Sequence, residues 1–186
     1  LSPQLSPDGK LLAYLAPVDG VMNVWVGPAD DPGKAKPVTQ ETKRGLRQFG
    51  WTFAPNQLVF AQDQGGDENF HVYVVDVTTG KSTDLTPIAG VRADILAASH
   101  KVPGKLLVLI NDRDKRHHDV YEVDLKTAQR KLVFKNEEGF RTIADLDLKV
   151  RAVTKFLPDA TLELSEVDAG GKRRSLIKFA SEDVMG

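Results

Sequence analysis

Residues 72–76 read Val-Tyr-Val-Val-Asp, residues 120–124 read Val-Tyr-Glu-Val-Asp, and residues 164–168 read Leu-Ser-Glu-Val-Asp. Each stretch is rich in residues that favour β-strands and ends in an aspartate, a residue that favours turns. The closing aspartates of the three stretches lie 48 and 44 positions apart. A period of roughly 40–50 residues with several short strands in each repeat is typical of the blades of a β-propeller.

The repeat divides the chain into about four blades, at residues 1–40, 45–88, 91–136 and 140–180. Each blade is predicted to be a sheet of four antiparallel strands, and the first blade lacks most of its inner strand. We therefore expect an all-β fold, a β-propeller segment that forms an incomplete ring. A β-sandwich also has short strands at regular spacing, but it does not explain the internal repeat. An incomplete ring leaves the flanks of its end blades open, so self-association through those flanks is expected.

Two patterns predict packing between neighbouring blades. Residues 106–110 read Leu-Leu-Val-Leu-Ile, which is apolar on both faces of a strand and suits a strand covered on both sides. Trp25, Tyr73 and Tyr121 occupy equivalent positions of the repeat. An aromatic binding platform would have this periodicity, but packing between blades explains it better.

Composition excludes several classes of function. The 186 residues carry a net charge of -1, which gives no electrostatic reason to expect nucleic acid or an anionic membrane as a partner. Cysteine is absent, so disulfides, thiolate metal sites and a cysteine nucleophile are excluded. No apolar run approaches the roughly 20 residues of a membrane span. We expect a soluble protein without a cofactor, and the compartment stays open between cytoplasm and periplasm.

The chain resembles the N-terminal propeller of serine peptidases of the prolyl oligopeptidase family, in the acylaminoacyl-peptidase and dipeptidyl-peptidase-like branch. The Ser-Pro-Asp-Gly turn is common to many propellers, and the Gly-Asp-Glu-Asn segment with its Leu-Thr-Pro ending is more specific. The stretches that carry the resemblance are residues 5–14, 23–26, 66–73, 85–87, 111–113 and 119–121.

The resemblance implies a C-terminal α/β-hydrolase domain that carries a Ser-Asp-His triad, and a propeller that admits only short peptides to it. No serine of this chain has the Gly-x-Ser-x-Gly flanking of a nucleophile elbow; Ser82 and Ser99 both lack it. We therefore predict no catalytic residue here and a gating role, with the hydrolase domain and short peptides as partners. The alternative is a stand-alone propeller that binds a protein partner without any enzymatic activity.

Four residues are candidates for substrate binding. Asp67, Glu68 and Asn69 precede a predicted strand, and acidic residues there are suited to hold the amino terminus of a peptide, as in dipeptidyl-peptidase relatives. Turn capping by Asp and Asn, with Glu in water, is the simpler interpretation. Arg113 has the planar fork that binds a carboxylate or carbonyl, although the mixed charges of residues 112–116 favour a solvated hairpin loop with internal ion pairs.

The histidines give no metal site. His117 and His118 are adjacent and point to opposite faces of a strand, and a His71–His117 pair has no further ligands behind it. His100 follows Ser99 directly, but triad members meet through the fold and not through sequence adjacency. We therefore interpret all four histidines as surface residues.

Overall fold

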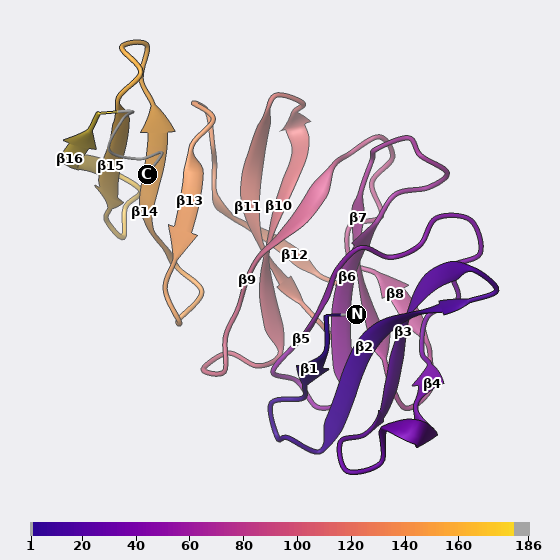
Figure 1. Cartoon of the computed structure of the whole chain (residues 1–186). Helices are drawn as coiled ribbons and strands as arrows, with labels where there is room; N and C mark the ends of the chain where they lie inside the picture. The colour runs from indigo at the N-terminus through magenta and orange to yellow at the C-terminus, as the bar shows by residue number, and fades with distance from the viewer. Residues whose placement is uncertain (1, 181–186) are drawn as a thin grey trace.

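The computed structural model describes residues 2–180, and this part of the chain is almost entirely β-structure. Four antiparallel sheets of four strands each follow one another along the chain. They stand side by side and form an arc (Figure 1). The expected all-β fold of about four propeller blades in an incomplete ring is confirmed.

Each sheet takes its four strands from one continuous segment of the chain. The first two sheets contain β1 (Gln4–Leu5), β2 (Leu11–Val18), β3 (Val21–Pro28), β4 (Lys36–Pro37), β5 (Phe49–Trp51), β6 (Gln57–Gln62), β7 (His71–Asp76) and β8 (Ser82–Asp84). The last two contain β9 (Ala93–Ala98), β10 (Lys105–Asp114), β11 (His117–Asp124), β12 (Arg130–Phe134), β13 (Arg141–Ala144), β14 (Val150–Phe156), β15 (Leu162–Val167) and β16 (Arg173–Phe179). The single helical element among residues 2–180 is a 3-10 turn, η1 (Pro32–Lys34).

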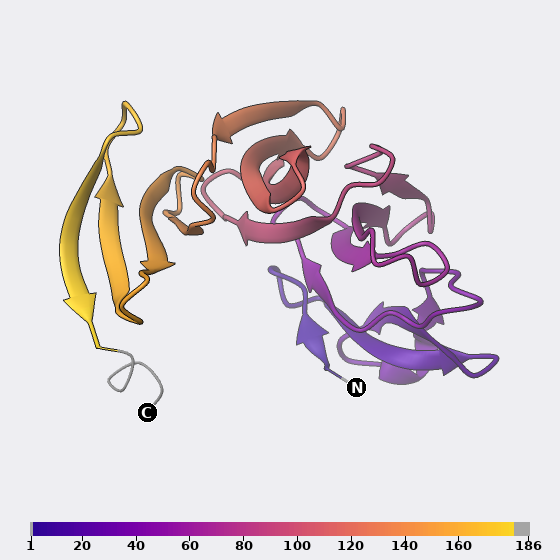
Figure 2. The same cartoon turned by 90° about the horizontal axis from the view of Figure 1, so that it is seen from above.

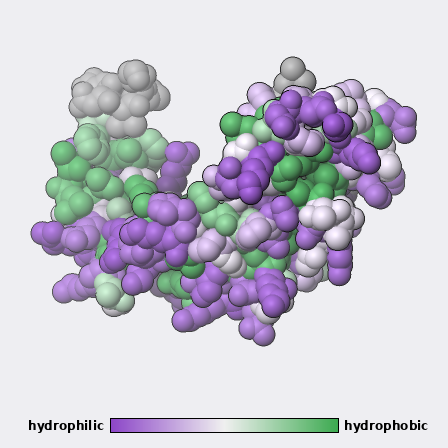
Figure 3. All heavy atoms as spheres, turned by 90° about the horizontal axis from the view of Figure 1, so that it is seen from below, coloured by the Kyte–Doolittle hydropathy of each residue, from purple (hydrophilic) through white to green (hydrophobic). Residues whose placement is uncertain are grey.

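The strands of each sheet lie in chain order, from β1 to β4 in the first sheet and equivalently in the others. The first strands β1, β5, β9 and β13 line the inner side of the arc, and the fourth strands lie on the outside (Figure 2). The space-filling view from below shows the hollow that the arc encloses (Figure 3). This arrangement of strands is that of propeller blades around an axis.

The core lies between the sheets and not within any one of them. Leu106, Val108 and Ile110 of β10 join the buried cluster shared with the second sheet. Leu107 of the same strand joins a different cluster, together with Leu148 from the fourth sheet. The prediction that this strand is covered on both faces is confirmed, because neighbouring residues of a strand point to opposite sides.

The aromatic residues of the repeat also pack between sheets. Tyr73 stacks on Phe60 with 5.3 Å between ring centroids, in the cluster shared by the first two sheets. Tyr121 packs against the cluster shared by the second and third sheets. Packing, and not a binding platform, therefore explains these two aromatic positions.

The aspartates that mark the repeat are turn caps. Asp76 accepts hydrogen bonds from the backbone of Thr78 and Thr79, each at 2.9 Å. Asp124 accepts the equivalent bonds from Lys126 and Thr127 at 3.0 and 2.8 Å. A carboxylate that caps the next backbone N–H groups fixes the tight turn between the third and fourth strands. Asp168 caps the equivalent turn of the fourth blade through the backbone N–H of Gly170 at 2.9 Å. The recurrence of this turn in the second, third and fourth blades explains the periodicity.

The charged segment 112–116, predicted to be a solvated hairpin loop with internal ion pairs, lies in the β10–β11 hairpin. β10 continues to Asp114 and β11 begins at His117, so only Lys115 and Arg116 form the turn. The expected internal ion pair is present, with 2.8 Å between Arg116 Nη2 and Asp114 Oδ2. The loop is shorter than expected, because the two strands stay paired up to the end of the hairpin, where Asp114 faces His117.

Apolar side chains are exposed mainly on the fourth sheet, where Figure 3 shows apolar spheres gathered over this part of the arc. Thr154, Leu164 and Ile177 are cross-strand neighbours and share one face. That face is opposite to the face of Val153, which packs toward the third sheet. We call it the open flank. Its exposed members include Ile143, Phe156 and Ile177, with 47%, 56% and 46% of their surface accessible.

Candidate functional site

The candidate residues gather at one edge of the sheets, which we call the upper edge because it is uppermost in Figure 1. This edge carries the β6–β7 connection and the β10–β11 turn. Since successive strands run in opposite directions, the starts of the inner strands β5 and β9 reach the same edge. The geometry of the blades thereby places connections that are far apart in sequence around one opening.

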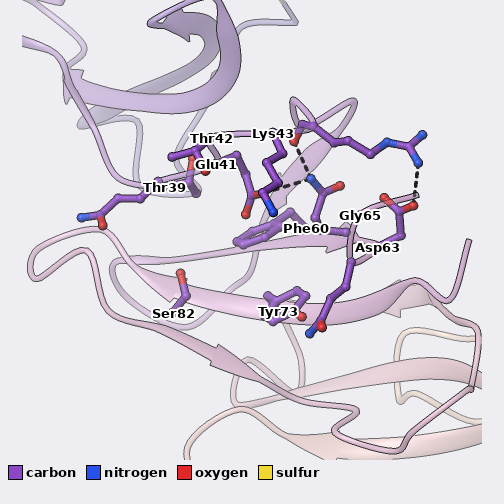
Figure 4. A pocket seen from close by; sticks show the side chains of 13 residues that line it. Thr39, Glu41, Thr42, Lys43, Phe60, Asp63, Gly65, Tyr73 and Ser82 are labelled. Atoms are coloured by element: carbon purple, nitrogen blue, oxygen red, sulfur yellow. Dashed lines mark hydrogen bonds and ion pairs between the residues drawn. The ribbon is translucent and has the colours of Figure 1, made fainter. Parts of the chain in front are cut away.

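A pocket of about 310 Å³ lies at this edge between the first two sheets. Its floor is formed by the stacked rings of Phe60 and Tyr73, and the segment 39–44, which joins the two sheets, covers it (Figure 4). Burial raises the pKa of the Tyr73 hydroxyl above its ordinary value of 10.0. Apart from these two rings, the pocket is lined mainly by polar and charged residues.

The rim of this pocket is fixed by hydrogen bonds. Gln62 donates from Nε2 to the backbone carbonyl of Arg44 at 2.6 Å and to Glu41 at 3.2 Å. Arg44 in turn forms an ion pair with Asp63, with 2.8 Å between Nη1 and Oδ2. The Asp63 side chain is only 1% exposed. Sequence reasoning missed these residues, although a charged residue directly after the apolar strand β6 was a signal that could have found Asp63.

The covering segment 39–44 is itself anchored by a buried asparagine. Asn23 of β3 accepts hydrogen bonds at Oδ1 from the Thr39 hydroxyl and from the backbone N–H of Glu41, both at 2.8 Å. Its Nδ2 donates to the Glu41 carbonyl at 3.0 Å. A completely buried amide with all these partners is satisfied, so it holds the segment over the pocket.

In the β6–β7 connection, Asp67 and Asn69 form hydrogen bonds with each other. Asp67 accepts hydrogen bonds from the backbone and side-chain nitrogens of Asn69 at 3.0 and 3.1 Å. These bonds lower the pKa of Asp67, and the hydrogen bond from the Asn69 side chain has the largest effect. Glu68 lies between them with a positive φ of 59° and an exposed side chain. Within residues 2–180 no hydrogen bond or ion pair engages the Glu68 carboxylate, so it is the one of the three that is free to meet a ligand.

Arg113 is engaged within its own sheet. Its Nε and Nη2 donate to the two carboxylate oxygens of Asp119 at 2.7 and 2.9 Å, and Nη2 also donates to the Asn136 carbonyl at 3.2 Å. Asp119 is nearly fully buried, with 1% of its side chain exposed. The structure places Arg113 at the upper edge together with the β6–β7 connection, but among the described residues no hydrogen bond or ion pair joins it to residues 67–69.

The prediction that all four histidines are surface residues holds only for His100. His71, His117 and His118 are half-buried, and His71 lies 2.7 Å from Asp84, measured from Nδ1 to Oδ2. Its position at the start of β7 places it beside the outer strand β8, which the sequence did not reveal. Across residues 2–180 no group of three or more metal-ligating side chains is found. The same residues contain no helix of the length and hydropathy of a membrane span.

Comparison with known proteins identifies relatives over nearly the whole chain. It is 43% identical over 183 residues to dipeptidyl aminopeptidase BIII of Pseudoxanthomonas mexicana, which covers 98% of this chain and 27% of that protein. It is 29% identical over 174 residues to dipeptidyl peptidase family member 6 of Caenorhabditis elegans, covering 87% of this chain and 23% of that one. The chain thus spans about a quarter of the length of these relatives. No family model matches the chain.

A solved structure supports the fold. The chain superimposes on a prolyl endopeptidase with a TM-score of 0.67 at 18% identity, covering 95% of this chain and 28% of that one. At this identity the likeness shows the propeller fold alone. Together with the sequence relatives, it confirms the resemblance found in the motifs: the chain belongs with the β-propeller segments of prolyl oligopeptidase-family peptidases.

Proposed function

We propose that the chain is the access-gating propeller region of a serine peptidase that hydrolyses short peptides. The observation that carries this proposal is the 43% identity to a dipeptidyl aminopeptidase over 98% of the chain. The gating acts by size and charge. Blades around an axis leave an opening that an extended peptide enters and a folded protein does not. The chemistry belongs to a hydrolase domain that carries the triad, and the four sheets contribute the wall.

A fluorophosphonate probe, which labels activated serines, tests the peptidase part of the proposal. The full-length protein is expected to be labelled at a serine outside residues 1–186, and the 186-residue chain is expected to remain unlabelled. If neither is labelled, the chain belongs to the alternative class, a stand-alone module that binds a protein partner. Labelling of the chain alone would contradict a non-catalytic wall.

The gating part needs a separate test on the full-length protein. A series of unstructured peptides of increasing length is expected to show kcat/KM falling with length, and a folded protein that contains the same cleavage sequence is expected to resist. Leu107→Ala, which opens a cavity at the contact of the third and fourth sheets, is expected to relax the length limit. Equal cleavage of the folded and the unfolded protein would contradict gating.

Within this function we propose Glu68 as the group that meets the amino terminus of the peptide. Asp67 and Asn69 shape the turn that presents it, and Arg113 braces the neighbouring hairpin through Asp119. Glu68→Gln in the full-length protein is expected to lower kcat/KM about tenfold for a peptide with a free amino terminus, and to leave its N-acetylated form unchanged. Asp30→Asn removes a carboxylate at the opposite edge of the sheets and serves as the control. Equal losses with both peptides would contradict the proposal.

We further propose that the 186-residue chain associates with itself through the open flank. The support for this proposal is the exposure of Phe156 and Ile177 on one face of the last sheet. In a longer propeller the next blade would cover this face, and without it a second copy of the chain offers the same apolar surface.

A further inference from the structure

A second cleft lies at the upper edge, between the second and third sheets. It has a volume of about 230 Å³, and its walls come from the starts of β5 and β9, from the end of β6 and from the start of β7. The view from above shows that these inner strands border the open centre of the arc (Figure 2). The residues that line the cleft are Arg47, Gln48, Ala61, Gln62, Phe70, Arg92, Ala93 and Asp94.

The two arginines of this cleft differ from most others in the chain. Both Arg47 and Arg92 are exposed, and within residues 2–180 neither guanidinium forms an ion pair or a side-chain hydrogen bond. Six other arginines are held by carboxylates. These six are Arg44, Arg113, Arg116, Arg151, Arg173 and Arg174. Two guanidinium groups that face one cleft without a carboxylate partner create a positive potential there.

Arg92 is also held in position. Its guanidinium carbon lies 5.5 Å from the centroid of the Phe70 ring, in a cation–π contact. Its backbone N–H donates to the side chain of Asn111 at 2.6 Å, and its carbonyl accepts from the Asn111 backbone at 3.2 Å. A guanidinium fixed from both its backbone and its ring contact loses little freedom when it binds a ligand, which favours binding.

The remaining lining residues fit an anionic group. The Gln48 amide is exposed and can donate a hydrogen bond beside Arg47. Asp94 is the single acidic residue in the lining, and its Oδ1 accepts the backbone N–H of Ile95 at 2.8 Å. It forms no ion pair with either arginine among the described residues. The cleft therefore keeps an excess of positive charge over a small apolar wall of Ala61 and Phe70.

We propose that this cleft, through Arg47 and Arg92, binds a carboxylate of the peptide that enters the propeller. The planar fork of arginine binds a carboxylate through two parallel hydrogen bonds. Phe70 ends the same connection that presents Glu68, so the β6–β7 connection borders both the proposed amine site and the carboxylate site. The choice of a peptide as the ligand rests on the proposed function. The positive charge of the site is independent of that function, because it follows from the lining residues. The carboxylate is either the carboxyl terminus or an acidic side chain.

The test uses the 186-residue chain and three forms of one N-acetylated pentapeptide: amidated without acidic residues, with a free carboxyl terminus, and amidated with a central glutamate. Binding is measured by titration calorimetry and by NMR shifts of the arginine side chains. We expect one or both carboxylate forms to bind more tightly than the neutral form, and the form that does so identifies the source of the carboxylate. The affinity should fall as salt is raised, because both partners are charged and accessible.

Arg92→Gln and Arg47→Gln are each expected to weaken binding of the carboxylate form about tenfold. Lys126→Gln removes one charge from an exposed turn at the opposite edge and is the matched control, expected to leave binding unchanged. In the described part of the chain the Arg47 side chain forms no hydrogen bond or ion pair, so Arg47→Gln remains informative if Arg92→Gln fails to fold. The proposal is overturned if the neutral peptide binds equally well, or if the arginine variants bind like the control.

The same variants separate this inference from the proposed gating. In the full-length protein, Arg47→Gln is expected to lower kcat/KM for the carboxylate peptide relative to the neutral one and to keep the dependence on peptide length. A length limit without any charge preference would overturn the carboxylate site alone. A charge preference without a length limit would overturn the gating alone.

Discussion

Arg113 and Asp119 are joined across the β10–β11 hairpin by two parallel hydrogen bonds, 2.7 Å from Nε to Oδ2 and 2.9 Å from Nη2 to Oδ1. The same carboxylate accepts the backbone N–H of Asn136 at 2.6 Å. Asn136 belongs to the segment that leads to the fourth sheet. The pair therefore ties the hairpin at the upper edge to the connection between two blades.

Asp119→Asn is expected to destabilise the chain by about 2 kcal/mol, because a buried carboxylate with two charge-assisted partners is replaced by an amide that satisfies them incompletely. Urea denaturation followed by circular dichroism measures the loss. Glu137→Gln is the control, since Glu137 pairs with Lys135, both side chains are more than half exposed, and exposed pairs contribute little. If both variants lose the same free energy of unfolding, the buried pair stabilises the fold no more than an exposed pair does.

The aspartates that cap the blade turns predict a dependence of stability on pH. Hydrogen bonds from the backbone of Thr79 and from the backbone of Thr127 lower the pKa of Asp76 and of Asp124 below the ordinary value of 3.8. A folded-state pKa below the unfolded value stabilises the folded chain above pH 3.8, and this contribution disappears as the pH falls through the folded value.

The melting temperature is accordingly expected to fall as the pH is lowered from 5 to 2. Asp124→Asn should melt lower than the wild type at pH 7, and the difference should shrink as the pH is lowered and the wild-type carboxyl becomes protonated. Glu68→Gln removes a carboxylate that caps nothing and should follow the wild-type profile. A difference between Asp124→Asn and the wild type that stays constant across this range would refute the assignment.

Ala128 and Gly80 occupy equivalent turns with positive φ angles of 56° and 70°. Alanine is strained in this left-handed region and glycine is not. Ala128→Gly is expected to stabilise the chain by up to about 1 kcal/mol, and Gly80→Ala to destabilise it by a similar amount. A Cβ at Gly80 would meet no atom closer than 3.9 Å, so the expected loss comes from the backbone and not from a clash. Thermal unfolding of both variants tests the opposite signs.

The open flank predicts concentration-dependent association of the 186-residue chain. The double variant Phe156→Glu, Ile177→Lys places opposite charges on that face and is expected to shift the chain to a monomer in sedimentation experiments. Leu132→Lys alters an exposed apolar residue of β12, outside the flank, and should associate like the wild type. A wild-type chain that is monomeric at all concentrations tested would rule out this interface.

The sequence alone determined the fold, because the features that specify a blade are local. The aspartates at the ends of β7 and β11 cap the turns that follow them, and their spacing reveals the repeat. The apolar run from Leu106 to Ile110 predicted a strand covered on both faces. Neighbouring residues of a strand point to opposite faces, so consecutive apolar residues need a cover on each side. Motifs around Gly66–Tyr73 were enough for the family resemblance.

Only the tertiary structure decided which candidate residues are free. Asp67 and Arg113 have the right chemistry in the sequence, but partners two and six residues away already occupy them. Arg47 and Arg92 lie far apart in the chain, and the cleft between two sheets brings them together. The charge of a residue is a property of its side chain, whereas its availability depends on which neighbours the packing of the blades supplies.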